Sequence, residues 1–256
     1  MTGAMLALDG VTVRLRGRTV LDGVSLAVPA GAVFALLGRN GSGKTTALRC
    51  LLGAHRPDDG RALLFGQDAW RHRAAAMARL GIVPEEPNVP LDMTPRGLSA
   101  FSAALYPRWD AAAFAARLHR LAISEATPFG GLSRGQKTQV LVTAALAARP
   151  DALVLDDPTL GFDAIARRDV LTELVRDLAD HGTTMLIATH DIAAVERLAS
   201  HVGVLAGGRV VLCGELEAIK AEFGRRGDGP LRAHDDGPAA LEDVFAAVVG
   251  DAQVAA

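Results

Sequence analysis

The chain has 256 residues, half of them hydrophobic, which is enough to bury one sizeable core. A formal net charge of −2 argues against a broad basic face that binds nucleic acid or anionic lipid by charge alone. The two cysteines, Cys50 and Cys213, lie far apart and are expected to be small buried residues in a reducing cytosol. No apolar stretch reaches the roughly 18 residues needed to cross a bilayer, and residues 1–10 do not resemble a signal peptide. We therefore expect contact with a membrane only through a partner.

The first elements combine strands with one glycine-rich turn. Residues 6–28 alternate between apolar and polar side chains, with turns at Gly17 and at 22–23, which predicts a small antiparallel sheet. Residues 33–37 form a continuous apolar run with the length of a buried strand. A glycine-rich turn follows, and then a helix over about 45–52. The order is strand, loop, helix.

Further strands and an insertion complete the core. Apolar runs at 152–155 and 184–188 each end in polar residues, and the helix-length segments between strands predict a parallel sheet with active residues at its carboxyl edge. Residues 90–149 are rich in Ala and Leu with helical spacing, which predicts an inserted helical lobe. Two short strands, 202–206 and 209–213, are joined by a two-residue turn and predict a hairpin at the sheet edge.

The predicted domain organisation follows from these elements. Residues 1–222 are predicted to form an α/β domain, a core of parallel strands with an antiparallel β subdomain and the helical lobe at about 90–149. Residues 223–238 are rich in Gly, Arg, Asp and Pro and read as a linker. Residues 239–256 are predicted to be a C-terminal helical tail, with Leu241 and Val244 on its apolar side.

The glycine-rich turn has the spacing of a phosphate-binding loop. Its residues are Gly38, Arg39, Asn40, Gly41, Ser42, Gly43, Lys44 and Thr45, with Thr46 next in the helix. Glycines allow backbone N–H groups to converge on phosphates, and the following helix adds its positive N-terminal end. Lys44 is expected to reach the β and γ phosphates of ATP, and the Thr45 hydroxyl to bind Mg²⁺.

Three polar residues follow the later strands. Asp156 is placed to bind Mg²⁺, and Asp157 to orient or deprotonate the attacking water. Two carboxylates after a strand also suit a helix N-cap, although the phosphate loop makes that reading the weaker one. His190 ends the next strand and is predicted to donate to the γ-phosphate; a lone histidine is more often structural.

A further motif precedes an Ala-rich helix. Leu132-Ser133-Arg134-Gly135-Gln136 places Ser133 at a plausible N-cap, and by itself is only a capped helix start. Together with the phosphate loop, the strand ending at 156–158, the segment 161–163 and His190, it resembles the ATP-binding cassette family, whose motifs occur here in the same order over residues 5–220.

This resemblance implies a RecA-like P-loop NTPase core for residues 1–222, together with partners and cofactors. Two cassettes, identical or different, are expected to pack head to tail, with each ATP and Mg²⁺ held between the Lys44 loop of one and the Ser133, Gly135 and Gln136 segment of the other. An integral membrane permease, and no nucleic acid, is the other expected partner, which would place the chain in the cytoplasm on the inner face of the cell membrane. The alternative is a soluble ATPase of the same family that acts on ribosomes or DNA.

A narrower resemblance concerns export. Residues 106–110, Tyr-Pro-Arg-Trp-Asp, and 241–245, Leu-Glu-Asp-Val-Phe, look like those of bacterial drug- and antibiotic-export ATPases that pair with a small type-2 permease. Tyr106 and Trp109 also suit the core of the helical lobe, because aromatic side chains in such a region usually fill space.

Three positions depart from the family pattern. Asp157 stands where the family usually has glutamate, and its shorter side chain predicts poorer positioning of water. Glu85 stands where glutamine is usual, and its carboxylate is a candidate Mg²⁺ ligand and sensor of nucleotide. Arg16 stands where an aromatic residue usually stacks on adenine; its guanidinium can stack there or point to solvent.

Overall fold

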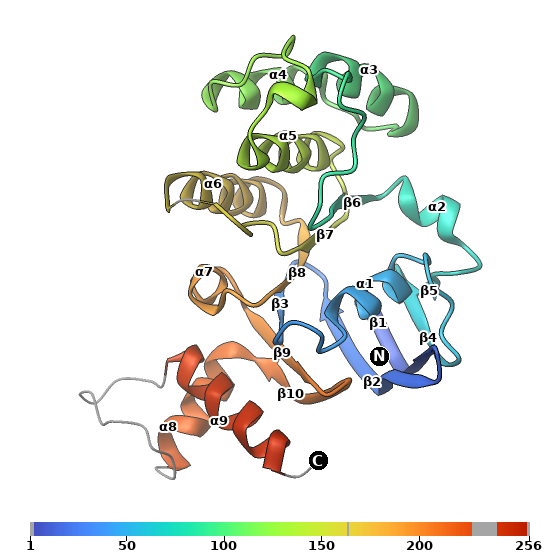
Figure 1. The fold of residues 1–256 in the computed structure, drawn as a ribbon, viewed down its shortest axis with the longest axis vertical. Helices are drawn as coiled ribbons and strands as arrows, with labels where there is room; N and C mark the ends of the chain where they lie inside the picture. The colour runs from blue at the N-terminus through green and yellow to red at the C-terminus, as the bar shows by residue number, and fades with distance from the viewer. Residues whose placement is uncertain (1–2, 163, 227–239, 255–256) are drawn as a thin grey trace. The chain divides into compact units, whose positions relative to one another are not determined.

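The computed structural model describes residues 3–162, 164–226 and 240–254 (Figure 1). The chain forms two compact units. One unit comprises Met1–Arg71 and Ile187–Ala256, and the other comprises His72–Leu186. Strand β8 (Thr184–Thr189) carries the chain from the second unit back to the first. Among the described residues, no helix is both long and apolar enough to cross a membrane.

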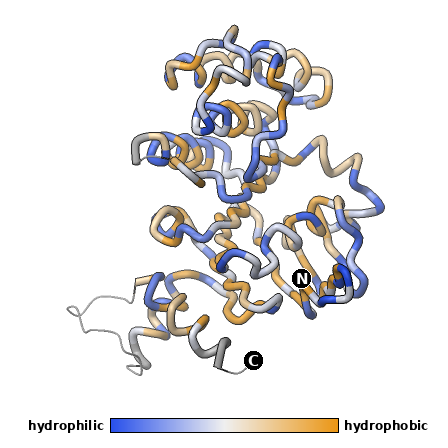
Figure 2. The backbone as a smooth tube through the Cα atoms, in the orientation of Figure 1, coloured by the Kyte–Doolittle hydropathy of each residue, from blue (hydrophilic) through white to orange (hydrophobic). Residues whose placement is uncertain are grey.

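The first unit contains most of the strands. Its elements are β1 (Ala4–Leu15), β2 (Arg18–Pro29), β3 (Val33–Leu37), α1 (Lys44–Leu51), β4 (Asp59–Leu64), β5 (Gln67–Asp68), α7 (Ile192–Glu196), β9 (His201–Ala206), β10 (Arg209–Glu215), α8 (Leu216–Arg226) and α9 (Leu241–Val254). Figure 2 shows hydrophobic residues along these strands, and every residue of β3 is buried.

The predicted antiparallel sheet is confirmed. Its strand order is β2-β1-β4-β5, and β1 pairs with both β2 and β4 in antiparallel register, with Leu8 opposite Leu26 and Leu6 opposite Leu64. Leu6, Leu8 and Val11 of β1 are buried, and a register shift between Leu8 and Val11 interrupts the period-2 alternation.

The parallel strand that carries the phosphate loop lies beside β9. Leu36 of β3 pairs with Gly203 of β9 in parallel register, and β9 continues into β10 as an antiparallel hairpin. Gly207 and Gly208 form the turn with φ of +54° and +78°, values that a two-residue hairpin requires and glycine adopts without strain. The predicted hairpin is therefore confirmed.

The second unit combines two parallel strands with the helical lobe. Its elements are α2 (Arg73–Met77), β6 (Leu80–Val83), α3 (Pro95–Leu105), α4 (Ala111–Arg120), a short 3-10 turn (Phe129–Gly131), α5 (Arg134–Ala147), β7 (Ala152–Asp156) and α6 (Ala164–His181). Strands β6 and β7 pair in parallel, with Ile82 opposite Val154. The inserted lobe predicted for residues 90–149 corresponds to α3, α4 and α5.

The lobe has its own hydrophobic core. Its buried members come from α4, α5 and the segment between them: Phe114, Leu118, Ile123, Phe129, Leu132, Val140 and Ala147. Trp109 packs against this cluster, with its ring 5.4 Å from that of Phe114 and its Nε1 donating to Ser99 Oγ at 3.2 Å. Trp109 therefore fills space in the lobe core.

Helices occupy the end of the chain, and one of them extends into the predicted linker. Helix α8 continues through 223–226, where the linker was predicted to begin, and the rest of that predicted linker lies outside the described residues. Helix α9 buries Leu241 and Val244 against α7, α8, β9 and β10. Glu196 Oε1 accepts from the Leu241 backbone N–H at 3.1 Å and from Lys220 Nζ at 2.8 Å. The tail helix is thus packed onto the first unit.

The cysteines also differ from each other. Cys50 is buried, and burial together with the nearby Asp58 carboxylate raises the pKa of its thiol to about 11, so it stays protonated at neutral pH. Cys213 is exposed on β10, so the expectation of two buried cysteines is wrong for this residue. The alternating burial of β10, at the edge of its sheet, explains the exposure.

The lobe core yields a stability prediction. Leu118→Ala removes a fully buried side chain between α4 and α5, and we expect it to lower the free energy of unfolding by about 2–5 kcal/mol. Phe101→Ala is the control, because Phe101 on α3 is 57% exposed and its loss should cost about 0.5 kcal/mol or less. Urea unfolding followed by circular dichroism measures both. Equal losses would contradict the assignment of the core.

Candidate nucleotide site

The phosphate loop connects β3 to α1, and glycines set its backbone. Gly43 is the N-cap of α1 with φ +108°, and Gly41 has φ +80°; both values lie in the left-handed region that other residues rarely adopt. A Cβ on Gly43 would lie 2.7 Å from Leu21 Cδ2, and one on Gly38 would lie 2.6 Å from the Leu205 carbonyl oxygen. The loop is therefore closed to side chains at these positions and leaves its backbone accessible to a ligand.

Lys44 folds back over this loop. Its Nζ donates to the carbonyl oxygen of Gly38 at 2.8 Å and to that of Arg39 at 3.4 Å, and the residue is only 7% exposed. An ammonium has three N–H donors, and these two contacts hold it at the start of α1. The first turn of α1 contains no acidic residue that would neutralise the cation. The ammonium and the positive end of the helix favour an anion at the same place.

Ser42 supplies an independent sign of a ligand. Its Oγ is buried and has no hydrogen-bond partner in the protein, while its backbone N–H donates to the Arg39 carbonyl oxygen at 3.1 Å. A buried hydroxyl without a partner is costly, and native structures usually pair such groups. A phosphate oxygen would satisfy it. The donors of this loop thus fit the phosphates of ATP.

Helix α1 carries the next two predicted site residues on its first turn. Thr45 and Thr46 are half-buried, so their hydroxyls are neither sealed in the core nor fully in solvent. Thr45 comes directly after the Lys44 that the loop carbonyls hold. Its place at the positive end of the helix suits a hydroxyl that binds the metal of a metal–phosphate complex.

Two more predicted site residues belong to the first unit. His190 is exposed immediately after β8, and Asp191 then caps α7 by accepting from the Ala194 N–H at 3.2 Å. The Asp191 N–H donates to Thr189 Oγ1 at 3.0 Å, so both neighbours of His190 are fixed. Arg16 lies in the turn between β1 and β2 with φ +49° and is exposed.

The paired aspartates lie in the second unit at the end of β7. Asp156 is half-buried, and Asp157 is 8% exposed with φ +44°. The Leu160 N–H donates to the Asp157 carbonyl oxygen at 3.0 Å and closes the turn after the strand. A non-glycine residue in this conformation stores local strain, and Asp tolerates it better than most residues. Such strain is typical of residues fixed for a function.

Glu85 also belongs to the second unit, in the segment after β6. It is exposed, and no ion pair involves it among the residues that the structure describes. Likewise, within the described ranges, no group of three or more His, Cys, Asp or Glu side chains is arranged to hold a metal. Mg²⁺ is usually bound through substrate phosphates and one or two protein carboxylates, so it does not need such a group.

The motif at residues 132–136, the signature segment, forms a complete capping box. Ser133 Oγ accepts from the Gln136 N–H at 3.2 Å, and Gln136 Oε1 accepts from the Ser133 N–H at 3.0 Å, so the predicted N-cap is confirmed. The first turn of α5 leaves the N–H groups of Arg134 and Gly135 without helical acceptors. Gly135 lies beside Phe162, since a Cβ there would be 3.8 Å from its ring.

The structure thus groups the predicted site residues by unit. Lys44, Thr45 and His190 belong to the first unit, and the signature segment and the aspartates to the second. The phosphate loop before α1 and the parallel strands define a P-loop nucleotide-binding protein.

Comparisons with known proteins identify the family. The family described as "ABC transporter" matches residues 21–160. The chain is 36% identical over 229 residues to "Nod factor export ATP-binding protein I" of Ralstonia nicotianae, an alignment that covers 86% of this chain and 70% of that protein. The chain belongs to the ABC transporter family and is an ATP-binding, ATP-hydrolysing subunit.

Solved structures of ATP-binding cassettes also resemble this chain. One described as an "ATP binding subunit of ABC transporter" has a TM-score of 0.81 and 25% identity, and the match covers 95% of this chain and 99% of that one. A dimeric ATP-binding cassette in a post-hydrolysis state with ADP and Pi has a TM-score of 0.73 at 20% identity, covering 83% of this chain and 99% of that one. The latter likeness shows the fold alone.

Proposed function

We propose that this chain is the motor of an exporter, which binds and hydrolyses MgATP and drives a separate integral membrane permease at the inner face of the cell membrane. The observation that carries the proposal is the phosphate loop, with its folded-back Lys44 and the buried, unpartnered Ser42 hydroxyl. The name of the Ralstonia relative, an export ATP-binding protein, supports the direction of transport. The permease determines which compound is transported.

Each residue has a role in the proposed reaction. The N–H groups of residues 38–46 and the Lys44 ammonium bind the phosphates, and Thr45 and Asp156, with Glu85, would hold Mg²⁺. When bound, Mg²⁺ neutralises charge on the β and γ phosphates. Asp157 orients the attacking water and accepts its proton, while His190 donates to the γ-phosphate. Arg16 packs against the base.

The proposed active form contains two cassettes. A single phosphate loop contacts one side of the triphosphate, and the first turn of α5, with Ser133, Gly135 and Gln136, offers donors for the other side. We propose that these donors come from a second subunit, identical or different, packed head to tail. The motifs shared with the ATP-binding cassette family imply this arrangement. No nucleic-acid partner is proposed.

Asp157 gives the first test. Asp157→Asn should bind ATP normally yet hydrolyse it at least about a hundredfold more slowly, because the amide cannot accept the proton of the attacking water. Asp157→Glu should keep or raise the rate by bringing the carboxylate closer to the water, even though φ +44° suits Asp better. Single-turnover hydrolysis and nucleotide binding are measured together. Hydrolysis that survives in the asparagine variant would remove Asp157 from the mechanism.

Mixed dimers test the head-to-tail arrangement. Lys44→Ala impairs the phosphate loop but keeps the signature segment, whereas Ser133→Arg does the reverse. A purified heterodimer of the two then has one intact site and one doubly impaired site. The heterodimer should occlude about half as much ATP as the wild-type dimer, because it has one intact site where the wild type has two. Either homodimer should occlude none.

The homodimers are the matched controls for this experiment, since each contains the same substitutions without an intact composite site. Labelled ATP retained after rapid gel filtration measures occlusion. A verified heterodimer that retains no ATP would refute the head-to-tail site between copies of this chain, and a site formed within one subunit would show no rescue.

A further inference from the structure

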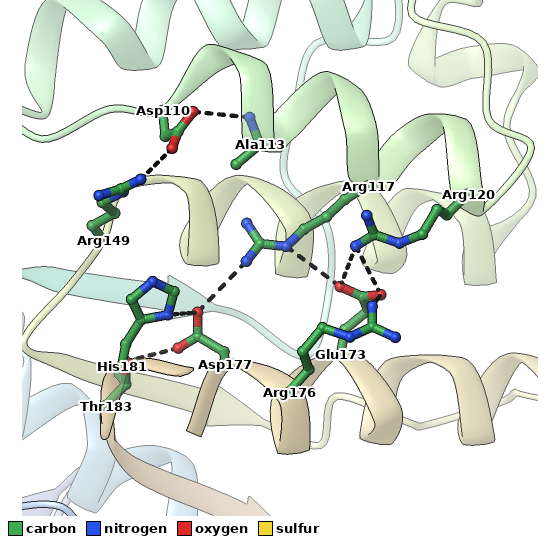
Figure 3. Close-up of polar contacts among 10 residues, drawn as sticks. All are labelled: Asp110, Ala113, Arg117, Arg120, Arg149, Glu173, Arg176, Asp177, His181 and Thr183. Carbon is green, nitrogen blue, oxygen red and sulfur yellow. Dashed lines mark hydrogen bonds and ion pairs between the residues drawn. The ribbon is translucent and has the colours of Figure 1, made fainter. Parts of the chain in front are cut away.

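A cluster of charged side chains joins α4 to α6 within the second unit (Figure 3). Arg117 extends from α4 between two carboxylates of α6: its Nε lies 3.4 Å from Glu173 Oε2 and its Nη2 lies 3.6 Å from Asp177 Oδ1. All three side chains are nearly buried, with 11%, 10% and 2% of their surface exposed. Arg117 is therefore a buried cation that spans two carboxylates on another helix.

Other polar groups complete the cluster. Glu173 also accepts from Arg120 at 3.0 Å and from Arg176 at 2.7 Å. Asp177 accepts from Thr183 Oγ1 at 2.7 Å, and His181 Nδ1 lies 3.2 Å from its Oδ1. Each carboxylate thus has several partners, as a buried charge requires.

Such a cluster fixes geometry more than it adds stability. The desolvation of buried ions offsets most of their attraction, whereas separating the partners leaves an uncompensated charge. A movement of α4 away from α6 would do this to Arg117 and Asp177 together. Arg120 also lies on α4, but its side chain is 45% exposed, so water can replace its carboxylate partner. Arg117 is thus the stronger constraint on the two helices.

The two helices are linked to the proposed reaction at their other contacts. Helix α4 shares its core with α5 and with Leu132, the first residue of the signature segment. At the start of α5, Gly135 lies beside Phe162, and the Arg134 guanidinium is near Gly161. Residues 161–162 continue directly from the aspartates of β7 toward α6. Each of the helices α4, α5 and α6 therefore contacts the other two, and the signature segment lies at the start of α5.

We propose that Arg117 is a positioning residue: by holding α4 to α6, it fixes the signature segment 132–136 relative to segment 156–162 of the same chain. It touches neither ATP nor the reacting atoms. The proposal rests on the head-to-tail function above, because the fixed segment then serves the ATP on the partner's phosphate loop. Removing the Arg117 charge should weaken occlusion at the site that receives this chain's signature segment.

The mixed dimer shows in which subunit Arg117 is needed for ATP occlusion. Arg117→Met keeps most of the side-chain volume but removes the charge. Placed in the Lys44→Ala subunit, which supplies the only sound signature segment, it should reduce ATP occlusion about 10- to 100-fold, since misplacements of about 1 Å cost this much. Placed in the Ser133→Arg subunit, which supplies the sound phosphate loop, it should change occlusion by less than about twofold. A general folding defect would not depend on placement.

Arg120→Met is the matched control, on the same helix and with the same carboxylate, and should alter occlusion by about twofold or less in either subunit. Equal effects of Arg117→Met in both placements, or none, would overturn the inference. Failure of the parental heterodimer to occlude ATP would instead count against the head-to-tail function.

A distance measured between α4 and α6 of a single subunit tests the positioning role independently of the dimer. Nitroxide labels at Ala116→Cys on α4 and Arg168→Cys on α6, both exposed positions, in a chain carrying Cys213→Ser, should give a narrow distance distribution. Arg117→Met should broaden it and Arg120→Met should not. An unchanged distribution in the Arg117 variant would refute the positioning role whatever the dimer shows.

Discussion

The loop between β3 and α1 depends on a steric constraint: its backbone must come close to a ligand, and side chains would prevent this. Gly43 combines a left-handed backbone with neighbours that leave no room for a Cβ, and Gly38 is crowded by a carbonyl oxygen. Because these positions carry no side chain, the Lys44 ammonium can fold onto the loop carbonyls and the Ser42 hydroxyl is left buried without a partner. This geometry fits the phosphates of ATP.

The second unit applies a different kind of constraint. Its aspartates sit at the end of a buried strand, with Asp157 in a left-handed conformation, and its signature segment is locked by a capping box. The buried cluster around Arg117 joins α6, which follows the aspartates in the chain, to α4, which shares its core with Leu132 and α5. Phosphoryl transfer depends on positioning and charge, so the rigidity of this unit matters as much as the identity of the residues.

Much of this could be predicted from the sequence, for identifiable reasons. Short-range patterns predicted the antiparallel sheet, the β9–β10 hairpin and the cap at Ser133, because each depends on residues only a few positions apart. The packing of α9 could not be predicted, since an amphipathic face does not say what covers it. Arg117 and Glu173 are 56 residues apart, and only the fold brings them together. In the sequence, the proximity of Arg117 to the apolar residues Phe114 and Leu118 indicates only that its side chain lies near a buried face of α4.

The central claim is that the phosphate loop, through Lys44, recognises the β and γ phosphates. Calorimetric titration of MgATP and AMP into the wild type and Lys44→Ala tests it most directly, with thermal unfolding as a check on the fold. We expect MgATP affinity to fall at least about a hundredfold in the variant, while the weak affinity for AMP stays within about twofold, because AMP lacks the phosphates that the ammonium contacts. Equal MgATP affinity in the two proteins would contradict the account.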